Sequence, residues 1–240
     1  IINGQKLWTS RALQSDLMLL LARTTPAEEI TKRGNGLTVF LVDLTKAVGN
    51  GVEIRPVDAM INHNTTEIFI DNLKVPADSI VGEEGKGFWH ILDGMNAERI
   101  LIAAEALGDA RWFTKKATSY ATEREVFGRP IGANQGIQFP IARAHAETQA
   151  ADLMARKAAA LFDAGIPCGA EANMAKMLAS EASWHAGDSC FQTYGGFAFA
   201  REYDIERKWR ETRLFQTAPI STNMILAYIS QHVLGMPRSY

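Results

Sequence analysis

Residues 140–164 read PIARAHAETQAADLMARKAAALFDA, and this stretch decides the fold. It is rich in alanine and has no glycine or proline after its first residue, which is typical of one long helix. Pro140 suits a helix start, because the first turn does not need the missing backbone N–H, and the glycine and proline that follow suit a stop. We therefore predict a helix from Pro140 to Ala164.

Three more segments after residue 85 have the same helical texture. They run from Gly85 to about Arg111, from Glu171 to about Thr193 and from Thr222 to Leu234. Long helices joined by short connections favour an antiparallel bundle. The large apolar residues of the alanine-rich helix are expected in the bundle core rather than against a ligand: Leu153, Met154, Leu161 and Phe162.

Residues 1–81 differ, because short apolar or β-branched runs alternate there with turns. Strands are expected over residues 17–22, 37–43 and 67–71, with turn-rich stretches at 24–26, 33–36 and 48–51. The predicted fold class is α+β: a partial antiparallel β domain over residues 1–81, followed by an antiparallel four-helix bundle over residues 82–240. Asn3-Gly4 is a type I′ hairpin signal, and a chain seldom begins inside a hairpin. We therefore expect an N-terminal portion to be absent from this sequence.

Composition excludes several classes of function. The 240 residues are 47% hydrophobic and carry a net charge of −2, so no broad positive field favours nucleic acid. No apolar run approaches the ~20 residues that span a bilayer. Cys168 and Cys190 form no CxxC pair and suit a reduced compartment. A bacterial cytoplasm is favoured, and a mitochondrial matrix would look the same. No metal site is predicted, because the five histidines lack ligand spacing: His63, His90, His145, His185 and His232.

Glu98 is the candidate catalytic residue. It stands in residues 94–103, GMNAERILIA, with apolar residues before and after it. A carboxylate buried on such a helix would have a raised pKa, which suits a general base. By itself, the Glu98-Arg99 pair is more often a surface charge pair, so the choice depends on the rest of the chain.

Other segments offer contacts for a ligand, each with an ordinary structural alternative. Trp8, beside Ser10, would cover a planar ring or would be a core residue at a strand end. Gly195 and Gly196 end a helix, where they would let a ligand approach the backbone or would simply cap the helix.

The segment 124–131 is expected to form a loop between helices. Phe127 and Ile131 are predicted to anchor it through apolar contacts. Arg124 or Arg129 would then pair with a phosphate through bidentate hydrogen bonds, or both would be solvated.

Taken in order, these segments resemble the acyl-CoA dehydrogenase family over the whole chain. The matching stretches are residues 2–10 (INGQKLWTS), 67–76 (EIFIDNLKVP), 82–88 (GEEGKGF), 123–131 (EREVFGRPI) with Gln135, 192–197 (QTYGGF) and 210–211 (RE). The resemblance implies an FAD-dependent oxidoreductase of fatty acid metabolism. It also implies a middle β domain and a C-terminal four-helix bundle, with the family's N-terminal helical domain absent.

The resemblance further implies a homotetramer, built as a dimer of dimers, in which subunits share FAD. Trp8 and Ser10 match residues that flank the isoalloxazine, and Arg99 is expected to bind substrate. The residues that match contacts to a neighbouring subunit's FAD are Arg124, Phe127 and Gln135, with Gln192, Thr193, Tyr194, Gly195 and Gly196 on its adenosine side. A second flavin contact matches Ser221, Thr222 and Asn223.

The base stands at one of two places in such proteins. Most carry it in a Tyr-Glu-Gly-Thr motif, but here residues 215–222 read FQTAPIST and Pro219 takes the Glu position. A second group, like isovaleryl-CoA and long-chain dehydrogenases, carries it in an Asp-Leu-Glu-Arg-like run, which residues 95–99 match. The resemblance thus implies that Glu98 takes the α-proton of an acyl-CoA thioester while the β-hydride passes to flavin N5. Electron-transfer flavoprotein is then the expected acceptor.

Pro219 also leaves two alternatives open. In the family, a backbone N–H at this position binds the thioester oxygen, and proline has none. One alternative is a redox-neutral elimination or desulfination on a CoA thioester. The other is a non-catalytic subunit that completes a neighbour's FAD site. Glu105, about two turns after Glu98, is expected to face solvent rather than line a pocket.

Overall fold

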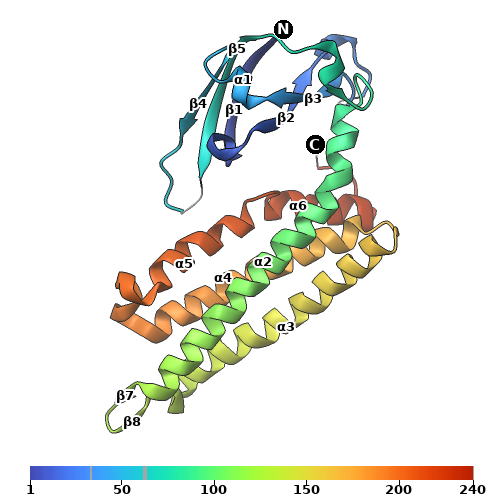
Figure 1. Cartoon of the computed structure of the whole chain (residues 1–240). Coiled ribbons are helices and arrows are strands. Elements are labelled where there is room, and N and C mark those ends of the chain that lie inside the picture. Colours follow the sequence, from blue (N-terminus) through green and yellow to red (C-terminus); the bar gives the residue numbers. More distant parts are fainter. Residues whose placement is uncertain (33, 62–63, 240) are drawn as a thin grey trace. The chain divides into compact units, whose positions relative to one another are not determined.

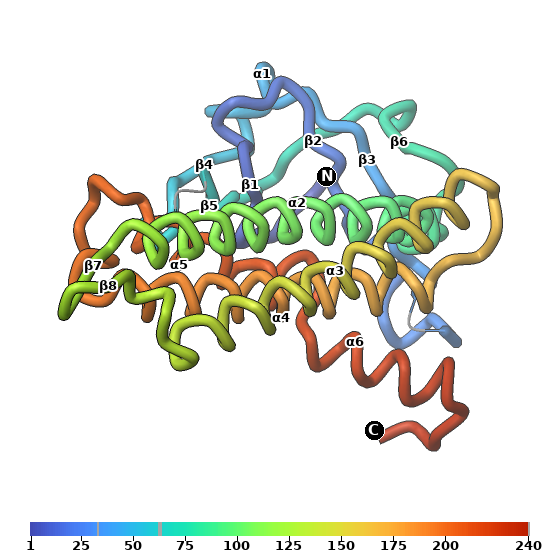
Figure 2. The backbone as a smooth tube through the Cα atoms, turned by 90° about the horizontal axis from the view of Figure 1, so that it is seen from below, coloured from blue at the N-terminus to red at the C-terminus, as the bar shows by residue number. Residues whose placement is uncertain are grey.

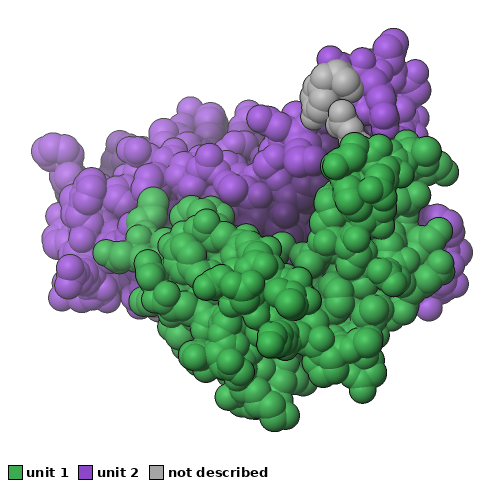
Figure 3. Space-filling model, turned by 90° about the horizontal axis from the view of Figure 1, so that it is seen from above, with its two compact units in different colours: residues 1–94 green, residues 95–240 purple. Residues whose placement is uncertain are grey.

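A computed structural model describes residues 1–32, 34–61 and 64–239, so the predictions that involve Arg33 and His63 lie outside the described residues. The chain divides into two compact units, Ile1–Gly94 (unit 1) and Met95–Tyr240 (unit 2), coloured separately in Figure 3. The division falls inside helix α2, which covers Gly87–Glu123.

Unit 1 contains two antiparallel sheets of three strands each. One sheet has the order β1 (Ile2–Ser10), β5 (Thr65–Leu73), β4 (Val52–Pro56), and the other has the order β2 (Leu17–Arg23), β3 (Leu37–Asp43), β6 (Ile80–Val81). A short helix, α1 (Leu44–Ala47), follows β3 (Figure 1). Both sheets contribute to one apolar core, to which β2, β3, β4 and β5 supply buried side chains.

The predicted strands are confirmed, but the predicted hairpin turn at Asn3-Gly4 is wrong. Both residues lie within β1, at a register shift against β5. Asn3 Oδ1 accepts a hydrogen bond of 2.7 Å from the backbone N–H of Asn72, which has a φ of 52°. The conformational freedom of the Asn-Gly pair therefore forms a bulge rather than a turn. The edge strand β4 was not predicted, since it is short and ends in Pro56.

Unit 2 is an antiparallel helical bundle, as predicted. Helices α3 (Gln135–Asp163) and α4 (Gly169–Tyr194) lie side by side along their length, and α2 crosses them (Figures 1 and 2). Helix α5 (Ile205–Thr212), the 3₁₀ turn Arg213–Gln216 and α6 (Thr222–Tyr228) return along α4, and a π-helical turn, Ile229–Val233, follows. None of the helices in the described ranges combines the length and apolarity that a membrane crossing requires.

The predicted helix boundaries need two corrections. Helix α3 begins at Gln135, so Pro140 is inside it rather than at its start. The Asn134 carbonyl accepts from the N–H groups of Ile137 and Gln138, which opens the helix before the proline. Pro140 then removes only one hydrogen bond, to the carbonyl of the exposed Gly136. Helix α2 extends twelve residues beyond the expected Arg111, to Glu123.

The bundle core is built from alanine rather than from the larger residues that were predicted. Its buried members on α2, α3 and α4 include Ala103, Ala106, Ala151, Ala155, Ala158, Ala175, Ala179 and Ala182. The prediction is wrong for Leu153 and Phe162, which are 71% and 43% exposed, while Met154 and Leu161 are half-buried. Small side chains at facing positions let the helices approach closely, although Leu107 and Phe113 of α2 are buried as well.

Candidate functional site

Glu98 and Arg99 lie on α2 and differ in burial. Glu98 is exposed in this chain, so its expected burial is wrong here, and it accepts no hydrogen bond among the described residues. Arg99 is half-buried and donates from Nη1 to Asn96 Oδ1 at 2.9 Å. Its Nε is buried and has no hydrogen-bond partner within residues 1–32, 34–61 and 64–239. Burial lowers the pKa of the Arg99 guanidinium, although Tyr228 and Glu98 act in the opposite direction.

Three helices meet around Arg99, at what we call the polar end of the bundle: Asn96, Arg99, Gly169, Asn173 and Tyr228. A Cβ on Gly169 would stand 2.9 Å from Tyr228 Oη, so only glycine fits there without displacement of the phenol. Asn173 Nδ2 donates to the Gly169 carbonyl at 2.8 Å, and its Oδ1 is buried without a partner in the part of the chain described. Polar groups are thus enclosed at the end of the bundle where Glu98 lies.

The segment that begins α6 is held at the same end. Lys176, on α4, is fully buried, and its Nζ donates to the Ile220 carbonyl at 2.7 Å. Burial lowers the pKa of Lys176 to about 8. Ser221 caps α6, because its Oγ accepts from the N–H of Met224 at 3.4 Å. Ser221 and Thr222 are half-buried and Asn223 is exposed.

A β-hairpin forms the opposite end of the bundle, between α2 and α3. Strands β7 (Glu125–Val126) and β8 (Arg129–Pro130) are joined by Phe127 and Gly128, whose φ angles are 53° and 76°. Two positive φ angles define a type I′ turn, which Gly128 accommodates readily. The prediction that Phe127 anchors this segment is wrong: the ring is 100% exposed, because the tight turn projects it into solvent.

Two ring contacts join the end of α2, just before the hairpin, to the end of α4. The Arg124 guanidinium lies 5.8 Å from the Phe197 ring centroid, and Tyr120 stacks on Tyr194 with centroids 4.0 Å apart. Helix α4 stops at Tyr194, as predicted, and Gly195 has a φ of 57°. We call this region the hairpin end: Arg124, Phe127, Gln135, Gln192, Gly195 and Gly196. All six of these residues are exposed, and Gln135 is the first residue of α3.

Two residues predicted for the same site point into the core instead of outward. Thr193 Oγ1 donates to the Ser189 carbonyl at 2.7 Å within α4, and Tyr194 packs against Tyr120. Burial raises the pKa of Tyr194 to about 12. Their side chains therefore support the segment from inside, while Gln192 and the two glycines form its outer face.

Trp8 and Ser10 belong to unit 1. Trp8 is 65% exposed and has a φ of 64°, at a second register shift between β1 and β5. Ser10 is exposed at the end of β1, in register with Thr65. The alternative of a tryptophan packed in the core is thus wrong.

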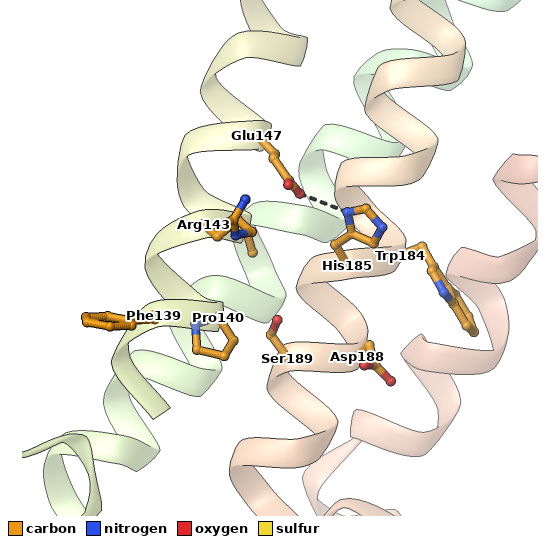
Figure 4. Close-up of a pocket in the computed structure, with 9 residues that line it drawn as sticks. Phe139, Pro140, Arg143, Glu147, Trp184, His185, Asp188 and Ser189 are labelled. Atoms are coloured by element: carbon orange, nitrogen blue, oxygen red, sulfur yellow. Dashed lines mark hydrogen bonds and ion pairs between the residues drawn. The ribbon is translucent and has the colours of Figure 1, made fainter. Parts of the chain in front are cut away.

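A groove that no sequence argument predicted runs between α3 and α4. It has a volume of about 410 Å³, and Figure 4 shows Arg143 and Glu147 on one helix facing His185 and Ser189 on the other. His185 Nδ1 and Glu147 Oε2 are 2.8 Å apart. The sequence signal for this groove was the spacing of four residues between Arg143 and Glu147 and between His185 and Ser189, which places each pair on one helix face.

The two ends of the bundle are well separated. Gly169 opens α4 at the polar end, and Gln192 lies at the hairpin end, about 35 Å along the axis at 1.5 Å per residue. Figures 1 and 2 both show the β7–β8 hairpin and α6 at opposite ends of unit 2. The structure therefore gathers the predicted residues of unit 2 into two clusters rather than one.

Sequence comparison identifies the family. A sequence model described as acyl-CoA dehydrogenase, middle domain, matches residues 1–73, and one described as acyl-CoA dehydrogenase, C-terminal domain, matches residues 85–234. The chain belongs to the acyl-CoA dehydrogenase family. The resemblance and the α+β fold class predicted from the sequence are confirmed, while the domain boundary placed after residue 81 stays a prediction.

Individual relatives agree with this family. The chain is 38% identical to acyl-CoA dehydrogenase fadE12 of Mycobacterium bovis, over 100% of this chain and 61% of that protein. The solved glutaryl-coenzyme A dehydrogenase bound to glutaryl-CoA gives a TM-score of 0.91 at 30% identity, over 99% of this chain and 59% of that one. A chain of the solved electron transferring flavoprotein of Acidaminococcus fermentans gives 0.90 at 28%, over 97% and 60%. The chain thus spans about three fifths of the length of these relatives.

Proposed function

We propose that the protein is an FAD-dependent acyl-CoA dehydrogenase in which Glu98 takes the α-proton of the thioester. The observation that carries the proposal is the place of Glu98. It stands beside Arg99 at the polar end of the bundle, in a chain that matches the family over its length. The names of fadE12 and of glutaryl-coenzyme A dehydrogenase support an acyl-CoA substrate.

The side chains present fit a flat cofactor that carries phosphates. Trp8 and Phe127 offer exposed aromatic rings on backbone of positive φ, a conformation that costs about 1–3 kcal/mol and tends to persist where function requires it. Arg124 provides an exposed cation beside Gly195 and Gly196, where a pyrophosphate can approach the backbone. When bound, FAD would supply the hydride acceptor.

Glu98 and Arg99 have different proposed roles toward the substrate, as general base and as hydrogen-bond donor. The Glu98 carboxylate, without hydrogen bonds among the described residues, is able to turn toward an α-carbon and hold its proton at a carboxylate oxygen. We infer that cofactor and thioester enclose it when they bind. Arg99 adjoins Glu98 on α2 and is half-buried, and we infer that its guanidinium donates to a substrate oxygen.

Pro219 favours a second candidate function. Because proline cannot donate a hydrogen bond, the thioester oxygen needs another donor, and loss of one such donor typically costs about 10²–10³ in rate. A redox-neutral elimination or desulfination on a CoA thioester, in which the flavin is not reduced, is therefore the second candidate. A non-catalytic subunit is a third candidate, which the presence of Glu98 opposes.

The separation of the two clusters supports shared cofactors. Ser221–Asn223 follow Ile220, whose carbonyl Lys176 binds, and Lys176 is about 24 Å from Gln192 along α4, so we infer that different FAD molecules meet Ser221–Asn223 and the hairpin end. We therefore propose that each chain contacts two FAD molecules, one at each end, and that a homotetramer pairs polar ends with hairpin ends of neighbouring copies. Electron-transfer flavoprotein is the proposed acceptor.

An anaerobic substrate screen tests the proposal. The intact protein, loaded with FAD, is mixed with acyl-CoA thioesters of different length and branching, and the flavin absorbance is followed. Bleaching by at least one thioester is expected. Product formation without bleaching would favour the redox-neutral candidate. Absence of both bleaching and product, together with unchanged behaviour of Glu98→Gln, would contradict an enzymatic role.

A further inference from the structure

Helix α4 carries a stripe of polar residues that faces the interior of the bundle. Asn173, Lys176, Ser180 and Ser183 are at most 2% exposed, and their spacing of three and four residues places them on one face. Polar side chains in such a place lose their hydration, so each needs a hydrogen-bonding role. The buried ammonium of Lys176 is the most demanding of the four.

Two members of the stripe reach the segment that returns along α4. The hydroxyls of Ser183 and Thr212 hydrogen-bond to each other, and Lys176 Nζ donates to the Ile220 carbonyl at 2.7 Å. These two contacts bracket the segment between Thr212 and Ile220, which contains Pro219. Ser221 and its neighbours, which open α6, follow directly.

Lys176 is unusual because its charge has no carboxylate partner. No ion pair of Lys176 occurs among residues 1–32, 34–61 and 64–239, and the hydrogen bond from its Nζ goes to a backbone oxygen. An apolar side chain of the same length would fill the site without the loss of hydration. A role other than stability is therefore expected of the ammonium, and its hydrogen bond within the described part of the chain points to the Ile220 carbonyl as the target.

We propose that Lys176 is a positioning residue: by holding the Ile220 carbonyl, it fixes the peptide that leads into α6 and presents Ser221, Thr222 and Asn223 to the flavin. This inference rests on the proposed function, which makes those three residues a flavin contact. Lys176 acts through the backbone of Ile220 and does not itself touch the cofactor. A hydrogen bond to a charged donor is about twice as strong as a neutral one, which suits a contact that must fix a peptide plane.

The test compares Lys176→Met, an apolar side chain one atom shorter that loses the donor, with Lys176→Gln, which is equally short but keeps a neutral donor. The control is Lys157→Met, which removes an exposed lysine on α3 that pairs with Glu171. FAD dissociation constants, flavin visible circular dichroism and thermal midpoints are measured on the full chain. We expect Lys176→Met to weaken FAD binding about tenfold and to change the flavin dichroism without a lower thermal midpoint. Lys176→Gln is expected to fall between Met and wild type, and Lys157→Met to match wild type.

Each outcome decides a different point. Wild-type dissociation constants and dichroism in a folded Lys176→Met protein would overturn the inference while the proposed function stands. If Lys176→Met does not fold, the same result in a folded Lys176→Gln protein overturns it, because the glutamine amide is one bond shorter and uncharged. A wild-type protein that retains no FAD would overturn the proposed function and this inference together.

Discussion

At the hairpin end of the bundle the candidate ligand contacts lie outside the core, whereas at the polar end several of the polar groups lie inside it. Phe127, Arg124 and the two glycines after α4 are exposed, and Phe127 stands on a tight turn. Lys176 and Asn173 are buried, and Arg99 is half-buried. An exposed contact can be changed with little effect on folding, while a buried polar group affects folding and ligand geometry together. Variants at the two ends should therefore separate binding from chemistry and from stability.

The largest expected effect lies at the polar end. Glu98→Gln should lower the rate of flavin reduction by acyl-CoA about 10³-fold, since a positioned general base typically contributes about 10²–10⁴. FAD content should not change. Glu105→Gln is the matched control, because it is exposed on the same helix two turns away and should retain the wild-type rate. Stopped-flow flavin absorbance measures both, and equal rates in the two variants would remove Glu98 from the mechanism.

The ion pair of Asp109 and Lys208 extends the comparison to a second enclosed lysine. Lys208 has a carboxylate partner, whereas Lys176 has none among the described residues. Lys208 Nζ donates to Asp109 Oδ1, and the side chains are 22% and 9% exposed respectively. Burial raises the pKa of Asp109, although Lys208 opposes this. Lys208→Met leaves the Asp109 carboxylate, the more buried of the two charges, without its partner, and should lower the free energy of unfolding by about 3 kcal/mol. Asp109→Asn should cost about 1 kcal/mol, because Lys208 still reaches water. Urea unfolding that gives equal losses would contradict this order.

At the hairpin end, Phe127→Ala should weaken FAD binding about tenfold, because an aromatic ring stacked on a base contributes about 1–3 kcal/mol. The thermal midpoint should not change, since the ring is fully exposed. Phe162→Ala, another exposed phenylalanine at the far end of α3, is the control and should bind FAD as wild type does. Flavin fluorescence titration and a melting curve together check the result. A lower midpoint with unchanged FAD affinity would assign Phe127 to the fold.

The smallest effect is a pH dependence from Lys176. Its pKa is about 8 in the folded chain and near 10.5 in the unfolded one. Below pH 8 both states hold the proton, and the penalty of the buried charge is fully present. Between pH 8 and 10.5 the unfolded state holds more protons, so stability rises with pH by at most about 1.4 kcal/mol per unit. The difference in unfolding free energy between wild type and Lys176→Met should shift in that direction from pH 7 to 10. A flat difference would show that the ammonium is not desolvated.

Several elements were predictable because local chemistry and tertiary packing agree. Residues 37–43 are rich in β-branched and aromatic side chains, and they form the inner strand β3. The alanine-rich stretch became α3, but its alanines rather than Leu153 form the core, since the spacing between helices depends on neighbours that no local pattern reveals. Helix α5 was missed because IERKWRET is mostly charged, and its i,i+4 ion pairs, such as Arg210 with Glu206, depend on the orientation of the helix.

In the candidate site, too, some features were predictable from the sequence and others were not. The family motifs predicted which residues gather at each end of the bundle, because those motifs are contiguous in sequence. Burial was not predictable: Glu98 is exposed, Phe127 projects from a turn, and Thr193 and Tyr194 point inward. Lys176 and the Glu147–His185 groove were missed, since their partners lie on other elements far along the chain.

Subunit complementation tests most directly the claim that each chain serves two flavins from opposite ends of its bundle. Glu98→Gln chains and chains with Arg124→Ala and Phe127→Ala are prepared separately, and each should reduce flavin poorly with acyl-CoA. Mixed subunits, unfolded and reassembled together, should regain flavin reduction, because the Glu98 of one chain then meets the intact hairpin end of the other. Activity in the hybrid no greater than the sum of the two parents would contradict the account.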